Sequence, residues 1–132
     1  MKPLPWKSLS EVDPAREYTV LATFFYLKSF LTTFRFFRMV RRVTEQLETG
    51  PPGLVGFSLR AKPLSRRYWT FSVWQDPKGL MSFVRNRPHL TAMEQLAPEM
   101  RAFDTARWSM FGRGYPPPWE EAYRRLTEKR AG

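Results

Sequence analysis

Hydrophobic and polar residues change their spacing several times along the chain. Residues 17–30 (EYTVLATFFYLKSF) carry β-branched and aromatic side chains at both even and odd positions. A strand with one buried face alternates apolar and polar residues, whereas a strand covered on both faces does not. This run therefore predicts a strand that is buried on both sides.

The spacing then becomes that of a helix over residues 29–50. Apolar side chains recur at positions i, i+4 and i+7 and form a widened stripe; its members are Phe30, Phe34, Phe36, Phe37, Val40, Val43 and Leu47. Ser29 or Thr32 is the candidate N-cap, and Gly50 is a suitable C-terminal stop. These signals predict a long amphipathic helix.

Two further strands are expected after a turn at residues 51–53. Residues 54–62 (LVGFSLRAK) alternate, which predicts four inward side chains: Val55, Phe57, Leu59 and Ala61. A hairpin then leads to residues 68–74 (YWTFSVW), where both parities are bulky again. Trp69 and Trp74 have opposite parity, so they must face opposite sides of the sheet.

Asp76 and Pro77 mark the next helix start, because Asp is a favoured N-cap and Pro fits the first helical position. The apolar residues of this short helix are Leu80, Met81, Phe83 and Val84. Pro88 should end it. Residues 89–97 (HLTAMEQLA) then form a second short helix.

Residues 102–113 (AFDTARWSMFGR) predict a fourth strand, which a proline-rich connector joins to a terminal helix. Parity divides the strand into two sets: Ala106, Trp108 and Met110 on one side, and Phe103, Arg107 and Phe111 on the other.

The order of elements is that of an α+β, ferredoxin-like βαββαβ sandwich with a four-stranded antiparallel sheet. We assign residues 1–16 to an irregular N-terminal arm, 17–111 to this domain, and 112–132 to a connector and C-terminal helix packed on the same domain. Several strands are apolar on both faces. We therefore expect the face without helices to meet the sheet of a second copy, which would give a homodimeric α/β barrel.

Composition excludes several kinds of chemistry. With no cysteine and one histidine in 132 residues, the chain has no disulfide, zinc–thiolate site or thiol nucleophile. No run reaches the ~20 apolar residues of a membrane span, and residues 1–18 lack a signal-like apolar stretch. We expect a cytoplasmic protein. Its formal charge of +10 favours anionic partners such as nucleic acid or a carboxylated ligand.

Three runs carry a family resemblance: GLVGFSL, RRYWTFSVWQDPKGLMSFVRNRPHLTAM and FDTARWSMF. A βαββαβ unit whose third strand runs into W-x-D and a helix resembles the antibiotic biosynthesis monooxygenase group of the dimeric α/β-barrel superfamily. Its uncharacterised bacterial branch is most similar, and the spheroidene monooxygenase type is more distant. The resemblance covers residues 17–111. It implies a homodimer with a cavity between the sheet and the helices of each subunit. The family's members include oxygenases without a cofactor or with haem, haem-degrading enzymes and proteins with no known reaction, so the fold does not fix the function.

The chain departs from this family at the first strand. The haem-degrading and quinone-forming members rely on an Asn, which the former have on that strand, whereas the first strand of this chain offers Thr19 and Thr23. Its only asparagine is Asn86. Neither family mechanism carries over intact.

His89 and Arg107 are the candidate catalytic residues. His89 has a near-neutral intrinsic pKa and could act as an acid or base, or as an axial ligand if haem binds; no other metal ligand is expected. The alternative is a partly exposed histidine in a helix corner. Arg107 lies within an apolar strand and needs a carboxylate, a ligand or water, so it could clamp an anion.

The candidate substrate-binding residues are aromatic, as an apolar pocket requires: Tyr26, Trp69, Trp74, Phe83 and Trp108. Core packing is the alternative for the tryptophans, because large aromatic side chains dominate such cores.

Two classes of function stay open, and with them the question of whether the chain is an enzyme. The first is a small dimeric monooxygenase, cofactor-independent or haem-dependent, that acts on an apolar or aromatic small molecule. The second is a non-catalytic ligand-binding or basic nucleic-acid-binding protein of the same fold. The run RRYW interleaves basic and aromatic residues, but no recognised nucleic-acid motif is present, so nucleic acid is the less favoured partner.

Overall fold

The computed structural model describes residues 6–29, 31–86 and 89–131, with side chains for all of these except 31–34, 63 and 129–131. The expected stripe members Phe30 and Phe34, the alternative N-cap side chain of Thr32 and the helix-breaking Pro88 lie outside the described residues and side chains. The same holds for residues 1–5 of the arm.

Five strands and four α-helices follow one another along the described chain. The elements are β1 (Lys7–Ser8), β2 (Glu17–Leu27), α1 (Leu31–Glu48), β3 (Leu54–Lys62), β4 (Arg67–Trp74), α2 (Pro77–Arg85), α3 (His89–Leu96), β5 (Met100–Phe111) and α4 (Trp119–Ala131). Short 3-10 turns occupy Pro63–Ser65, Ala97–Glu99 and Gly112–Gly114.

The strands form one antiparallel sheet in the order β1-β3-β4-β2-β5. Without β1, the order β3-β4-β2-β5 is that of a ferredoxin-like sheet, which confirms the predicted fold class. The predicted number of four strands was one too few, because the arm adds β1 at the edge. Only Lys7 and Ser8 pair there, with Phe57 and Gly56, and a two-residue strand leaves no periodic signal in the sequence.

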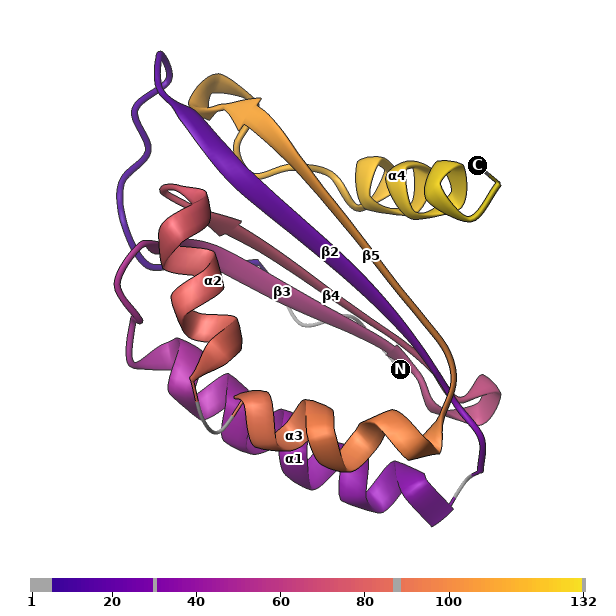
Figure 1. The fold of residues 1–132 in the computed structure, drawn as a ribbon. Coiled ribbons are helices and arrows are strands. Elements are labelled where there is room, and N and C mark those ends of the chain that lie inside the picture. The colour runs from indigo at the N-terminus through magenta and orange to yellow at the C-terminus, as the bar shows by residue number, and fades with distance from the viewer. Residues whose placement is uncertain (1–5, 30, 87–88, 132) are drawn as a thin grey trace.

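Helices cover both faces of the sheet (Figure 1): α1, α2 and α3 lie on one side and α4 on the other. In β2, Val20, Ala22 and Phe24 are buried in the cluster that includes Ala122 and Leu126 of α4. The two-sided burial predicted for β2 is therefore correct. Part of the second face is covered by the chain's own C-terminal helix, where we had expected a second copy. The homodimer stays a prediction.

A bulge in β3 corrects the predicted pattern of inward side chains. The pairing of β3 with β4 shifts between Leu54 and Gly56. As a result, Val55 joins the cluster beneath α4, while Phe57 packs on the side of the other helices. The alternation that placed both residues on one face was wrong at Val55, because a bulge changes parity by one residue.

The capping signals agree with the start of α2 and the end of α1, but not with the start of α1. Helix α1 begins at Leu31, so Thr32 lies inside it and cannot be its N-cap, and Ser29 does not directly precede its first residue. Asp76 is the N-cap of α2 and accepts a hydrogen bond from the Gly79 amide at 2.9 Å, with Pro77 in the first helical position. Gly50 follows α1 with φ +72°, a backbone conformation that glycine adopts without strain.

The Tyr115 hydroxyl group connects the arm to the sheet. It accepts a hydrogen bond from Nε1 of Trp6 at 2.6 Å and lies 2.7 Å from Oγ of Ser8. Gly56 lies directly beneath this contact: a Cβ there would lie 2.7 Å from Nε1 of Trp6 and 2.9 Å from the Lys7 carbonyl oxygen.

We expect Gly56→Ala to lower the free energy of unfolding by about 1–3 kcal/mol, the usual cost of overpacking, because the added methyl group must displace the arm. Urea unfolding of the two proteins measures this difference. Gly114→Ala is the matched control, since a Cβ there would make only an ordinary contact with Cε of Met110 at 3.6 Å. Equal losses in both variants would contradict this account of Gly56.

Candidate functional site

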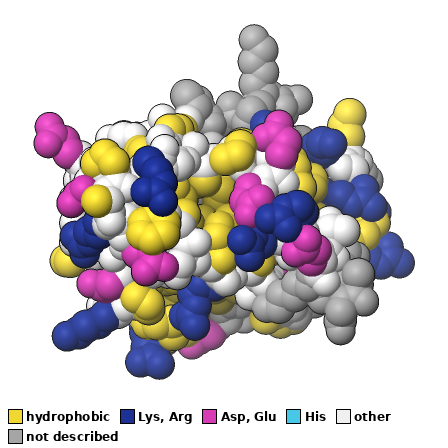
Figure 2. Space-filling model, turned by 90° about the horizontal axis from the view of Figure 1, so that it is seen from above, with side chains coloured by type: hydrophobic (Ala, Val, Ile, Leu, Met, Phe, Trp, Pro, Cys, Tyr) yellow, Lys and Arg dark blue, Asp and Glu magenta, His cyan; other side chains and the backbone are white. Residues whose placement is uncertain are grey.

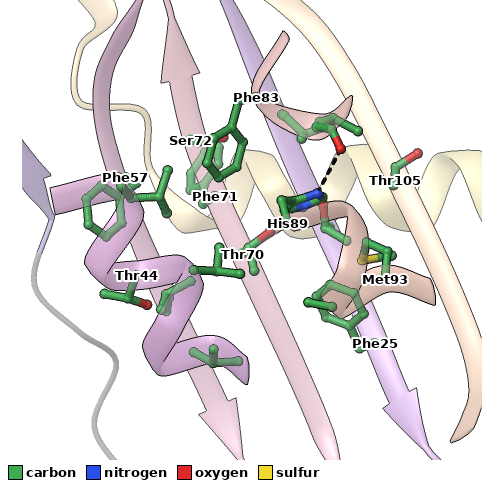
Figure 3. A pocket seen from close by; sticks show the side chains of 18 of the residues that line it. Phe25, Thr44, Phe57, Thr70, Phe71, Ser72, Phe83, His89, Met93 and Thr105 are labelled. Atoms are coloured by element: carbon green, nitrogen blue, oxygen red, sulfur yellow. Dashed lines mark hydrogen bonds between the residues drawn. The ribbon is translucent and has the colours of Figure 1, made fainter. Parts of the chain in front are cut away.

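A cavity of about 590 Å³ lies between the sheet and the three helices α1, α2 and α3. Its walls are mainly aliphatic, aromatic and methionine side chains from α1, α2, α3 and the facing side of the sheet. Figure 3 shows Phe83, Met93 and Phe25 around its centre. A cavity of this size and composition suits an apolar small molecule.

The sheet forms a floor with a row of hydroxyl groups. Thr23 of β2 pairs in register with Thr70 of β4 on one side and with Thr105 of β5 on the other. Side chains directly opposite one another on neighbouring strands have Cβ atoms about 5 Å apart. All three threonines line the cavity, so they form one short polar strip in an otherwise apolar chamber.

Thr23 is the central residue of this strip. Its side chain is 6% exposed, and its hydroxyl group has no hydrogen-bond partner among the described residues. Ser72 differs, because its Oγ accepts a hydrogen bond from Nε1 of Trp74 at 2.9 Å. Thr23 is not among the residues with a fully buried polar side-chain atom that lacks a partner, so its hydroxyl group is open to the cavity. A ligand or a water molecule in the cavity can therefore bind to it.

His89 faces the cavity from the first residue of α3. Its Nδ1 lies 3.3 Å from the Val84 carbonyl oxygen (Figure 3), and its ring packs against Phe83 with centroids 5.1 Å apart. A carbonyl can only accept, so Nδ1 must carry the proton and Nε2 is left with a lone pair. Among the described residues, Nε2 has no partner, which leaves this nitrogen free for a ligand.

Burial lowers the pKa of His89, and the hydrogen bond to the Val84 carbonyl opposes this shift only in part. Desolvation disfavours the imidazolium form. His89 is therefore neutral at pH 7, the form that can accept a proton or bind a metal.

Backbone hydrogen bonds where α2 meets α3 fix the position of His89 at the cavity. Helix α2 ends at Asn86, whose amide donates to the carbonyl oxygens of Ser82 and Phe83, and whose own carbonyl accepts from the Leu90 amide at 3.0 Å. These hydrogen bonds place the start of α3 beside the last turn of α2. Trp74 packs under the same turn, with its ring 5.3 Å from that of Phe83.

Arg107 lines the cavity from β5, opposite Leu21 in the sheet register. The residue is exposed, and its Nη1 lies 4.0 Å from Sδ of Met81 on α2. The histidine and the arginine thus approach the same cavity from the helical side and from the sheet.

Four of the seven predicted site residues meet at this cavity: Trp74, Phe83, His89 and Arg107. The other three do not line this cavity, because their parity directs them to the α4 side of the sheet. Trp69 packs against Phe24 and Tyr123, and Trp108 packs against Phe71. Tyr26 lies against the guanidinium groups of Arg66, Arg67 and Arg101.

The hydrogen bond from Arg101 and the positive charge of Arg66, Arg101 and Arg67 lower the pKa of the Tyr26 hydroxyl group. Tyr26 is partly buried on the α4 side of the sheet and does not line the cavity. Sequence reasoning missed the threonine strip instead, since positions 23, 70 and 105 become neighbours only through the strand register.

The described residues contain no cluster of three or more His, Asp or Glu side chains that could hold a metal ion. One described residue, His89, is suited to be the iron ligand of a haem group. Its Nδ1 is hydrogen-bonded to a carbonyl and its Nε2 has no partner among the described residues, which is the arrangement that orients a histidine ligand. Arg107 at the cavity would be the partner of a propionate. No described helix is long and apolar enough to cross a membrane.

The fold and the cavity define a ferredoxin-like α+β protein with a small-molecule chamber between its sheet and its helices. No family model and no curated protein matches the chain. Among solved structures it is similar to a protein from Nitrosomonas europaea assigned as an antibiotic biosynthesis monooxygenase, with 19% identity and a TM-score of 0.60, covering 76% of this chain and 94% of that one.

Two proteins assigned as monooxygenases are similar over part of their length. The one from Fusobacterium nucleatum has 12% identity and a TM-score of 0.66, covering 77% of this chain and 46% of that chain. The one from Lactobacillus acidophilus has 9% identity and a TM-score of 0.61, covering 74% and 45%. The chain thus spans less than half of either protein. At these identities the comparison shows a shared fold, and it confirms the predicted resemblance at that level.

We expect Thr23→Val to change the free energy of unfolding by less than ~1 kcal/mol in either direction, because the Thr23 hydroxyl group faces the cavity and makes no hydrogen bond with another described residue. Ser72→Ala is the control: losing the acceptor of Trp74 should cost about 1 kcal/mol. Urea unfolding measures both changes. A loss for Thr23→Val as large as that for Ser72→Ala would mean that the Thr23 hydroxyl is already satisfied.

His89 should make the folded protein sensitive to mild acid. Its pKa is lowered in the folded state, so below about pH 6.5 the unfolded chain binds the proton more readily. The stability present at pH 7 is then lost progressively as the pH falls. In His89→Gln, the free energy of unfolding should change less between pH 7 and pH 5.5 than in the wild type. Parallel curves for the two proteins would contradict a neutral, desolvated His89.

Proposed function

We propose that the chain is a monooxygenase that acts on an apolar, aromatic small molecule bound in the cavity between the sheet and helices α1, α2 and α3. The observation that carries the proposal is His89, a neutral imidazole with an unpartnered Nε2 in a chamber lined mainly by apolar side chains. The shared fold with proteins assigned as monooxygenases supports the reaction class.

A phenol that carries an activated methylene group fits this site best. Its rings would lie among Phe25, Phe83 and Trp74, and its hydroxyl group would reach His89 or the threonine strip. Exclusion of water from such a cavity strengthens the hydrogen bonds between the ligand and the protein and favours proton transfer between them. Thr23 supplies a hydroxyl group that can form a hydrogen bond with the substrate, which the apolar side chains of the walls cannot do.

In this reaction His89 is the general base. Its Nε2 takes the phenolic proton, which makes the ring electron-rich, and Nδ1 stays bonded to the Val84 carbonyl so that the positive imidazolium is oriented. The substrate supplies the electrons: R₂CH₂ + O₂ gives R₂C=O + H₂O. One oxygen atom enters the substrate and the other leaves as water with the two hydrogens of the methylene group.

A haem-dependent form of the activity would use the same residues differently. When bound, haem supplies an iron at which oxygen is activated. His89 would hold the group through Nε2, and Arg107 would hold a propionate by a charge-assisted bond. The apolar walls would keep water away from the reacting substrate in either form.

Oxygen uptake with 1,8-dihydroxyanthrone, a phenol that carries an activated methylene group, tests this proposal, with the protein in haem-free form and again after addition of haemin. We expect uptake that exceeds the spontaneous reaction, with 1,8-dihydroxyanthraquinone as product. His89→Gln should lower kcat by about a hundredfold or more, the usual contribution of a positioned general base.

Tyr26→Phe is the matched control, because Tyr26 lies on the opposite face of the sheet and should leave turnover unchanged. A His89→Gln variant that folds normally and turns over like the wild type would remove His89 from the mechanism. If the wild type binds 1,8-dihydroxyanthrone but consumes no oxygen in either form, the protein is a ligand-binding protein and the proposed activity is wrong.

A further inference from the structure

Strand β5 forms an edge of the sheet, since among the described strands it pairs only with β2. Its cavity-lining residues Phe103 and Arg107 are exposed, which marks this edge as the opening of the cavity. The lining residues Thr23 and Trp74, in contrast, are buried. Arg107 and Met81 approach each other from β5 and α2 across this opening.

The polar groups of the cavity therefore fall into two sets at different depths. Thr23 and His89 lie inside, each with an atom that lacks a partner among the described residues. Arg107 lies at the opening and is the one permanently charged side chain among the described cavity-lining residues. This arrangement matches a ligand with one polar end inside and one charged end at the opening.

Arg107 has no acidic partner of its own in the cavity lining. Among the described residues its polar contact is with Sδ of Met81 at 4.0 Å, and a thioether sulfur is a weak acceptor. A guanidinium group presents five N–H donors in a planar fork that matches a carboxylate. The donors of Arg107 are thus available to a ligand at the opening.

We propose that the cavity selects an amphipathic anion: an aromatic body inside, held by the apolar walls, and a carboxylate at the opening, held by Arg107. This deepens the proposed function, on which it rests for the cavity being a substrate site, and it names the substrate as an aromatic acid. Among the described residues, Arg107 is then the one basic residue of the cavity lining that contacts the ligand.

Calorimetric titration with two matched probes at pH 7.5 tests the inference: 2-naphthoate, which is ionised, and 2-naphthalenemethanol, which is neutral. We expect Arg107→Gln to weaken naphthoate binding by about tenfold, as the loss of a charge-assisted hydrogen bond should. The alcohol should bind Arg107→Gln and the wild type about equally. Arg107→Lys keeps the charge without the fork and should recover part of the loss.

Arg113→Gln is the control for net charge, since Arg113 lies beyond β5 against the ring of Phe111, outside the cavity lining. It should change neither affinity. The inference is overturned if Arg107→Gln weakens both probes equally or neither, or if the wild type binds neither probe. If the charge-dependent pattern holds while oxygen uptake fails, the proposed activity is wrong and the ligand class stands.

Discussion

The rest of the structure depends on one constraint: the central strand β2 must be buried on both faces. It pairs with β4 and with β5 along most of its length, so neither edge is open. Its even positions carry Val20, Ala22 and Phe24, and its odd positions include Leu21 and Phe25. Exposing either set would leave a large apolar surface in water. Helices are therefore needed on both sides, and α4 supplies the cover that the βαββαβ unit alone lacks.

The same strand explains where the cavity lies. On the side of α1, α2 and α3, one row across the sheet holds Phe25 with its neighbours Tyr68 and Phe103, and the next row holds the threonine strip. Large rings beside short side chains leave space above the short ones, which the helices bridge without filling. Because backbone pairing fixes the rows, the sheet register keeps the three threonines side by side.

Parity in the sequence was enough to separate Trp69 from Trp74 and to place Phe103 with Arg107, but it did not say which face carries the cavity. The face that carries the cavity depends on which face α4 covers. The sequence of α4 does not reveal which face of the sheet the helix packs against. Val55 shows a second limit, since a bulge reverses parity without any change in residue type. The threonine strip shows a third: long-range register is a property of pairing, and each threonine alone reads as an ordinary strand residue.

The basic side chains are distributed unequally between the two faces of the sheet. Among the described residues, basic side chains gather on rings of the α4 side: Arg60 lies over Trp119, Arg67 over Tyr26 and Arg125 over Trp108. On the face seen in Figure 2, basic and acidic side chains are intermingled around apolar ones and form no continuous basic stripe. Nucleic-acid backbones are bound by such stripes. These three arginines thus stabilise aromatic packing away from the cavity, whereas among the described residues that line the cavity Arg107 alone carries a permanent charge.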